Sequence, residues 1–302
     1  MTSESHDLIK LRNKIDKIDN SIQDLLNERA SIVDLVSSVK AKDSSTAKIR
    51  PGREAQILYR LMSRHNGRFP KRELARIWRE LIVATIGFEG PFSMAIYYTE
   101  TETGFWDLAR DQYGTNTPAS CFSSARRVIE AVQIGDSTLG IVPLPRHDEN
   151  ENWWRLIVSD LPETPKIIAR LPFIGYGNSR NKGIEALVIC NIEHEAMDGA
   201  RSFIAIESDR EVGLNLINKC LSEVQLLFAF QQVWQDTQRP PEWTYLIELT
   251  QFLGKNSEKA KHLSNILEKN GLRLLHLGGY ALPLGAEDFK DHQKGELGEP
   301  DV

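Results

Sequence analysis

The feature that most constrains this chain is a run of apolar residues spaced alternately four and three apart along its first 39 positions. Such spacing is typical of a long helix that packs along one continuous seam. Its apolar members are Leu11, Ile15, Ile18, Ile22, Leu25, Ile32, Val36 and Val39, and the one seam position between Leu25 and Ile32 is Arg29. An arginine in a packing seam is costly unless an anion meets it. The pattern therefore predicts a small anionic ligand held between helices.

Two further basic residues, Arg12 and Lys40, extend this cationic set. Lys40 follows Arg29 by about three helical turns, and so lies on nearly the same face. On one continuous helix with a rise of ~1.5 Å per residue, Arg12 and Lys40 stand roughly 40 Å apart, further than a metabolite reaches. If both serve one pocket, Arg12 must come from a second copy of the chain. A short helical segment also has too little partner surface to bury this seam alone, so the sequence predicts an intertwined homodimer.

Composition limits the classes of protein to consider. The 302 residues are 41% hydrophobic and 26% charged, as expected for a globular protein of two or three domains. No apolar run is long enough to span a membrane, no signal-peptide pattern is present, and the three cysteines lack metal-ligand spacing. We therefore expect a cytoplasmic protein with reduced, packed thiols, no membrane partner, no metal and no cofactor.

Charge is distributed unevenly along the chain. Residues 1–90 contain 17 Lys and Arg against 12 Asp and Glu, whereas the remainder contains 20 against 30. Basic character is thus concentrated where the seam lies, which suits an anionic substrate. A nucleic-acid surface is the alternative interpretation. The basic residues alternate with acidic ones and lie partly on the apolar stripe, so no nucleic-acid partner is expected.

The hydrophobic pattern divides the chain into four parts. Residues 1–91 predict an all-α domain of three helices, over 7–42, 51–65 and 70–86. The inward residues of the second and third helices are expected to be Ile57, Leu58, Leu61, Met62, Leu74, Ile77, Trp78, Leu81 and Ile82. Residues 92–197 alternate strands with helices and predict an α/β domain, in which Trp153 and Trp154 are interpreted as packing residues. Residues 198–284 predict a ferredoxin-like β-α-β-β-α-β unit, and residues 285–302 a polar, disordered tail.

Residues 8–90 resemble the all-helical class of chorismate mutases, a three-helix subunit that forms an intertwined dimer. The matching stretches are LIKLRNKIDKIDNSI, LLNERASIVDLVSSVKAK, IRPGREAQIL and ELIVATIGFEG. The resemblance implies that Arg12 of the partner subunit and Arg29 bind the two carboxylates of chorismate, and that Lys40 contacts its ether oxygen. It also implies that Lys40, Glu89 and Arg29 are the catalytic residues.

The same resemblance implies the remaining substrate contacts. Glu54 would hold the ring hydroxyl, and Arg53 would support a carboxylate. Thr85 would lie near a carboxylate, and Glu89 would contact the ether oxygen. Arg50 stands where the family pattern often has an aspartate near the ring hydroxyl, so the departure concerns that side of the site and leaves the cationic set unchanged.

The second half of the chain resembles prephenate dehydratase followed by an ACT regulatory domain. The stretches that carry this likeness are FSS at 122–124 before a helix, GIVPL at 140–144, and LHLGGYALPL near residue 280. The chemical motifs of the dehydratase are absent. PRH follows GIVPL where that family has Glu-Asn-Ser/Thr, and RSF at 201–203 stands in place of Thr-Arg-Phe. We therefore expect the fold to be retained and the dehydratase activity to be lost.

The sequence thus predicts a chorismate mutase that converts chorismate to prephenate in aromatic amino acid biosynthesis. Two alternatives remain open. One is a bifunctional chorismate mutase–prephenate dehydratase that makes phenylpyruvate. The other is a regulated mutase whose C-terminal region senses an aromatic metabolite or docks a partner.

Overall fold

The chain forms two compact units in the computed structural model, which describes residues 6–40, 49–87, 90–147, 151–175, 183–192 and 199–290. The first unit contains residues 1–48 and 84–90, and the second contains residues 49–83 and 91–302. One long helix makes up most of the described part of the first unit. A large sheet forms the centre of the second unit.

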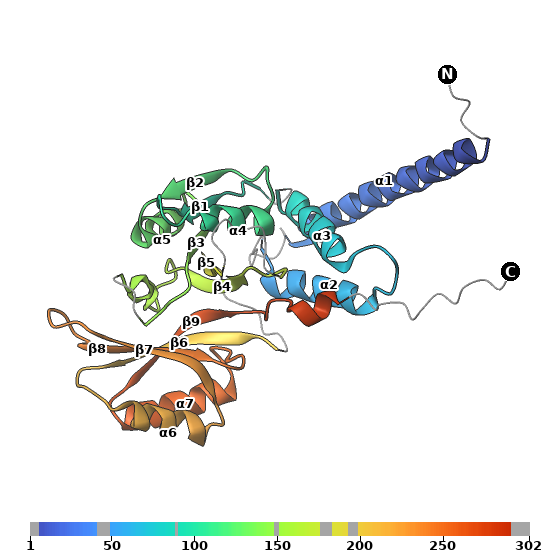
Figure 1. Ribbon diagram of the computed structural model, residues 1–302. Coiled ribbons are helices and arrows are strands. Elements are labelled where there is room, and N and C mark those ends of the chain that lie inside the picture. Colours follow the sequence, from blue (N-terminus) through green and yellow to red (C-terminus); the bar gives the residue numbers. More distant parts are fainter. Residues whose placement is uncertain are drawn as a thin grey trace. The chain divides into compact units, whose positions relative to one another are not determined.

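Three helices form the N-terminal part of the chain (Figure 1). Helix α1 spans His6–Lys40 without interruption, α2 spans Pro51–Arg64 and α3 spans Lys71–Ile86. The three helices predicted from the apolar spacing are therefore confirmed. Pro51 begins α2 at a position where its missing N–H costs nothing, because first-turn amides have no partner within the helix. Helix α3 contributes to both units, which divide between Val83 and Ala84.

The buried face of α3 agrees with the predicted one only at Ile82. The structure buries Ala75, Arg79, Ile82, Val83 and Ile86. Of the residues predicted to face inward, Ile77 is 45% exposed, and Leu74, Trp78 and Leu81 are only partly buried. The apolar pattern misplaces this face because its centre is occupied by a charged residue, Arg79, which hydropathy alone assigns to solvent.

A nine-stranded sheet runs through the second unit in the order β2-β1-β3-β5-β4-β9-β6-β8-β7 (Figure 1). The strands are β1 Met94–Tyr97, β2 Ala119–Phe122, β3 Leu139–Pro143, β4 Lys166–Leu171, β5 Ala186–Cys190, β6 Arg201–Ser208, β7 Phe228–Gln235, β8 Trp243–Leu249 and β9 Arg273–Tyr280. Strand β1 runs parallel to β2 and β3, and β5 is antiparallel to both β3 and β4. The neighbours from β9 through β6 and β8 to β7 are antiparallel.

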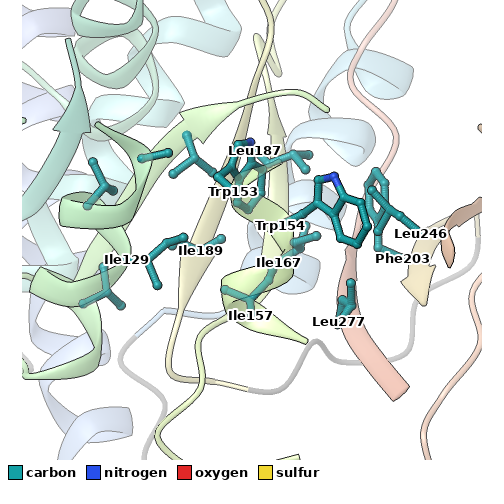
Figure 2. Packing of buried hydrophobic residues seen from close by; sticks show 14 of the residues in the cluster. Ile129, Trp153, Trp154, Ile157, Ile167, Leu187, Ile189, Phe203, Leu246 and Leu277 are labelled. Atoms are coloured by element: carbon teal, nitrogen blue, oxygen red, sulfur yellow. The ribbon is translucent and has the colours of Figure 1, made fainter. Parts of the chain in front are cut away.

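Helices cover both halves of this sheet. Helices α4 (Gly104–Tyr113) and α5 (Ala125–Gln133) pack against β1 and β3. A 3-10 helix, Trp153–Ile157, adds two tryptophans to the core, and both are fully buried as expected (Figure 2). Helices α6 (Leu214–Glu223) and α7 (Glu258–Lys269) share one core with β6 and β8 (Figure 1). The helical segment, the α/β part and the ferredoxin-like strand order are thus as predicted.

The α/β and ferredoxin-like parts meet inside the sheet, where β4 runs parallel to β9. The two strands pair at Ile167 and Gly278. Gly278 has φ +110, and a Cβ at this position would overlap the backbone of Ile167. Glycine is required here both by the backbone conformation and by the close approach of the neighbouring strand.

Three local predictions differ from the structure: the strands of the α/β part, the burial of one cysteine, and the start of the C-terminal tail. The sequence pattern did not predict β2 or β4. Cys121 is exposed because it lies on the edge strand β2, whereas Cys190 and Cys220 are buried as expected. The tail expected to be disordered from residue 285 begins with a 3-10 helix, Ala286–Phe289, and residues 291–302 lie outside the described residues.

Candidate functional site

Helix α1 carries three of the predicted site residues. Arg12 is exposed, Arg29 is partly buried, and Lys40 is the last residue of the helix, with its side chain outside the described structure. Because α1 is continuous from His6 to Lys40, Arg12 and Lys40 lie roughly 40 Å apart along it. Within one chain these two side chains cannot enter the same pocket.

The apolar seam of α1 is largely exposed in the single chain. Its members Leu11, Ile15, Ile18, Ile22, Leu25, Ile32 and Val36 have exposed fractions between 47% and 63%. Large aliphatic side chains gain roughly 1.5–3 kcal/mol each from full burial, so a continuous stripe of this kind marks an interaction surface. Arg29 lies in the stripe, and burial lowers the pKa of its guanidinium from the usual value. A desolvated cation therefore sits within an apolar surface.

Glu54 belongs to the second unit and is buried in the first turn of α2. Its carboxylate oxygen Oε2 accepts a hydrogen bond from Nη2 of Arg79, on α3, at 2.6 Å. The Arg79 guanidinium also lies 5.7 Å from the ring centre of Tyr113, on α4. A small cavity beside the pair is lined by Gln112, Ala169 and other residues of the sheet region. The structure thus places the Glu54 carboxylate against Arg79, facing α4 and β4.

The other predicted residues occupy separate places. Arg53 is exposed on α2, next to the buried Glu54. Thr85 is partly exposed in the last turn of α3, and Glu89 lies outside the described residues. Arg12, Arg29, Lys40 and Thr85 belong to the first unit, whereas Arg53 and Glu54 belong to the second.

Sequence reasoning missed Arg79 and Tyr113. Arg79 directly follows Trp78 inside an apolar helical stretch, and an arginine in such a stretch was the signal available for it. Tyr113 gave no signal, because the contact depends on how α3 packs against α4. Among the described residues, no cluster of His, Cys, Asp and Glu side chains forms a metal site. Within the same residues, no helix is long and apolar enough to cross a membrane.

Comparison with protein families identifies the N-terminal segment. Residues 11–90 match the family model for chorismate mutase type II, so the chain carries a domain of this class. The match covers α2, α3 and most of α1, and it includes every predicted site residue.

Relatives extend the similarity beyond that domain. The chain is 30% identical over 151 residues to the bifunctional chorismate mutase/prephenate dehydratase of Stutzerimonas stutzeri, covering 49% of this chain and 41% of the relative. It is 30% identical over 142 residues to the enzyme of the same name from Aquifex aeolicus, covering 46% of this chain and 39% of the relative. The alignments thus span about two fifths of the length of these curated relatives.

Among solved structures, prephenate dehydratase from Streptococcus mutans aligns with a TM-score of 0.48 and 12% identity. That alignment covers 64% of this chain and 98% of the solved chain.

Proposed function

We propose that this protein is a chorismate mutase that acts as a homodimer, and that its dehydratase-like region does not dehydrate prephenate. The observation that carries the proposal is the exposed apolar seam of α1 with the partly buried Arg29 inside it. The family match over residues 11–90 supports the choice of substrate.

The seam favours a second copy of the chain as its partner. A stripe of exposed aliphatic residues along a 35-residue helix would be covered by the same stripe of another α1. Because Arg12 and Lys40 are too far apart to share a pocket within one chain, the pairing also supplies the missing cation. In the proposed site, Arg29 and Lys40 of one subunit act with Arg12 of the other.

Fixed cations suit this reaction. Conversion of chorismate to prephenate is a pericyclic rearrangement that needs no nucleophile, metal or cofactor. An enzyme accelerates it by holding the dianion in its reactive conformer and by placing donors where negative charge develops on the ether oxygen. We assign carboxylate binding to Arg12, Arg29 and Arg53, with Thr85 beside them. We assign the ether oxygen to Lys40 and Glu89.

Glu54 takes the ring hydroxyl in this proposal, and Arg79 is added as the residue that fixes its carboxylate. A buried carboxylate held at 2.6 Å by a guanidinium is fixed in orientation, which suits a hydrogen-bond acceptor for a substrate hydroxyl. In this assignment Arg79, on α3, positions Glu54 without contacting the substrate itself.

The proposed loss of dehydratase activity rests on the residues that replace the motif. Arg201 stands where the family has threonine, and its guanidinium pairs with Glu248 at 3.0 Å. Ser202 is buried, and its Oγ accepts a hydrogen bond from the backbone N–H of Leu253. Nη1 of Arg201 and the Ser202 hydroxyl thus both make contacts within the protein.

One experiment tests both parts of the proposal. Purified protein is incubated with chorismate at neutral pH, and the loss of chorismate and the formation of prephenate and phenylpyruvate are followed separately. We expect saturable loss of chorismate with accumulation of prephenate. Failure to consume chorismate would overturn the mutase assignment, and saturable, protein-dependent formation of phenylpyruvate would overturn the loss of dehydratase activity.

A further inference from the structure

A cavity of about 570 Å³ opens in the second unit beside the ends of four strands. The end of β4, the approach to β5, the start of β6 and the end of β9 all contribute to it. Its wall is apolar, formed by Pro172, Ile184, Leu282, Pro283 and Leu284. This volume and this lining are those of a site for a small organic molecule, which needs few polar groups if they are well placed.

The polar end of the cavity is a network centred on Arg170, Arg201 and Tyr280. Nη1 of Arg170 donates to the hydroxyl of Tyr280 at 3.1 Å, and that hydroxyl donates to Glu248. Nη1 of Arg201 donates to the same Glu248 carboxylate oxygen at 3.0 Å. Tyr280 and Glu248 are buried, and burial together with Glu248 raises the pKa of Tyr280 to about 12. The hydroxyl therefore stays protonated, and oxygen Oε1 of Glu248 accepts from both Tyr280 and Arg201.

One donor of the network lacks an acceptor. Among the described residues, Nε of Arg201 is buried and makes no hydrogen bond. Buried N–H groups are nearly always paired in folded proteins, and an unpaired one on a charged guanidinium is especially unfavourable. Arg201 lines the cavity, so its guanidinium lies beside the space that an acceptor would occupy.

Glu185 already occupies the place that an anionic ligand would take. A single oxygen of its carboxylate, Oε1, accepts from both Nε and Nη2 of Arg170, at 3.1 Å and 2.7 Å. Arginine forks usually receive two oxygens, so this pairing leaves the fork incompletely used. The Glu185 side chain is 38% exposed, and an ion pair of this exposure separates at little cost.

We propose that this cavity binds a small monocarboxylate with an apolar body, whose carboxylate displaces Glu185 from Arg170 and contacts the guanidinium of Arg201. The charge balance selects the class of ligand. The charged groups of the network are two arginines, Glu185 and Glu248, so exchanging Glu185 for one ligand carboxylate keeps it neutral. A dicarboxylate would add an uncompensated negative charge to a partly buried site, and an amine would meet Arg170 and Arg201.

The site is independent of the proposed mutase activity, because every residue in it belongs to the sheet region. Residues 176–182 lie outside the described residues, and the site contains none of them. The inference also excludes the dianions chorismate and prephenate as ligands of this cavity.

Isothermal titration calorimetry of the 302-residue chain tests the proposal with three probes that share a phenyl group. These are 3-phenylpropionate, the matching alcohol 3-phenylpropan-1-ol, and the dicarboxylate benzylmalonate. We expect 3-phenylpropionate to bind at least ~10-fold more tightly than either of the others, since each good charged contact contributes about a factor of ten. Absence of 3-phenylpropionate binding up to about 10 mM, or equal binding of the alcohol, would overturn the proposal.

Two variants sharpen the test. Glu185→Gln removes the competing carboxylate and should tighten 3-phenylpropionate binding, whereas the matched change Glu258→Gln, on the exposed pair with Lys261, should leave it unchanged. Arg201→Gln should weaken binding by about tenfold or more. Thermal unfolding of each variant separates loss of binding from loss of fold. Weaker binding by folded Glu185→Gln would contradict the displacement of Glu185, and undiminished binding by folded Arg201→Gln would contradict the contact with Arg201.

Discussion

Arg79 and Glu54 form a buried ion pair between α3 and α2, with 2.6 Å between Nη2 and Oε2 and side-chain exposures of 2% and 10%. The pair faces Tyr113, which lies on α4 beside the sheet. A residue that the family resemblance assigns to substrate is therefore held by a contact that also involves the α/β part. Helix α4, which packs on the sheet, therefore contributes a contact to the ion pair that joins α2 and α3.

The first prediction concerns the stability of this pair. Arg79→Met should lower the free energy of unfolding by about 3–5 kcal/mol, because it leaves the Glu54 carboxylate buried without its partner. The measurement is urea denaturation followed by circular dichroism. Arg76→Met provides the control, since the Arg76–Asp111 pair at 3.1 Å is more exposed and should cost at most about 1 kcal/mol. An equal fall in the free energy of unfolding for both variants would show that the buried pair contributes no more to stability than the exposed one.

The second prediction concerns the cations of α1. Arg29→Ala and Lys40→Ala should each lower kcat/KM for chorismate by ~100-fold or more, because each removes a fixed charge from the proposed substrate site. Steady-state loss of chorismate is the readout. Lys17→Ala, which lies off the apolar seam, should remain close to wild type. Near-normal activity of both seam variants would place the active site elsewhere.

The third prediction concerns exchange between subunits. Arg12→Ala and Arg29→Ala should each be nearly inactive as pure proteins. Co-refolding of the two should restore part of the activity, because a mixed dimer contains one pocket with both arginines intact. The measurement compares the mixture with each parent at equal total concentration. Mixed dimers shown by mass spectrometry to be present but inactive would rule out a shared pocket.

The fourth prediction concerns the exposed seam itself. Leu25→Asp should convert the proposed dimer to monomer and abolish mutase activity, because it buries a charge in the proposed interface between α1 helices. Sedimentation velocity reports the oligomeric state. Asn20→Asp is the control, since Asn20 lies on the opposite side of α1 from the seam. A dimer that survives Leu25→Asp would require a different interface.

The fifth prediction concerns pH. Burial and then Lys255 lower the pKa of His276, with Lys166 acting in the same direction and Asp160 opposing it. Below the unfolded pKa of about 6.5, the unfolded chain therefore binds the proton more readily, and the free energy of unfolding falls as pH decreases. His276→Gln should make this fall shallower in urea titrations at pH 7.5, 6.5 and 5.5.

The exposed residue His262 on α7 supplies the matched control, and His262→Gln should retain the wild-type slope. A His276→Gln variant with the same slope as wild type would mean that this histidine does not contribute to the acid sensitivity.

The seam of α1 could be predicted because its apolar spacing is long and regular, and a single substitution such as Arg29 is conspicuous within it. The ferredoxin-like part was predictable for a related reason, since its strands are apolar and its helices are clearly bounded. Strand β4 was missed because Lys166 and Arg170 interrupt its apolar run, and their partners in the fold include residues far away in the sequence. Lys166 donates to the carbonyl of His276, and Arg170 pairs with Glu185.

The candidate site was less predictable than the fold. The inward face of α3 depends on Arg79, whose burial requires Glu54 on another helix. Nothing in the local sequence reports that pairing. Arg12, Arg29 and Lys40 could be singled out from one helix, but Arg12 and Lys40 lie roughly 40 Å apart along it, and bringing them together is part of the proposed dimer.

The pairing of β4 with β9 at Gly278 has a practical consequence for dividing this protein. A cut at the boundary expected near residue 198 would separate these two strands and leave both with open edges. Exposed strand edges recruit other chains, so either fragment would tend to aggregate even if its own helices were well formed. The two ends of the sheet resemble separate domains, but they should be expressed together as one fragment.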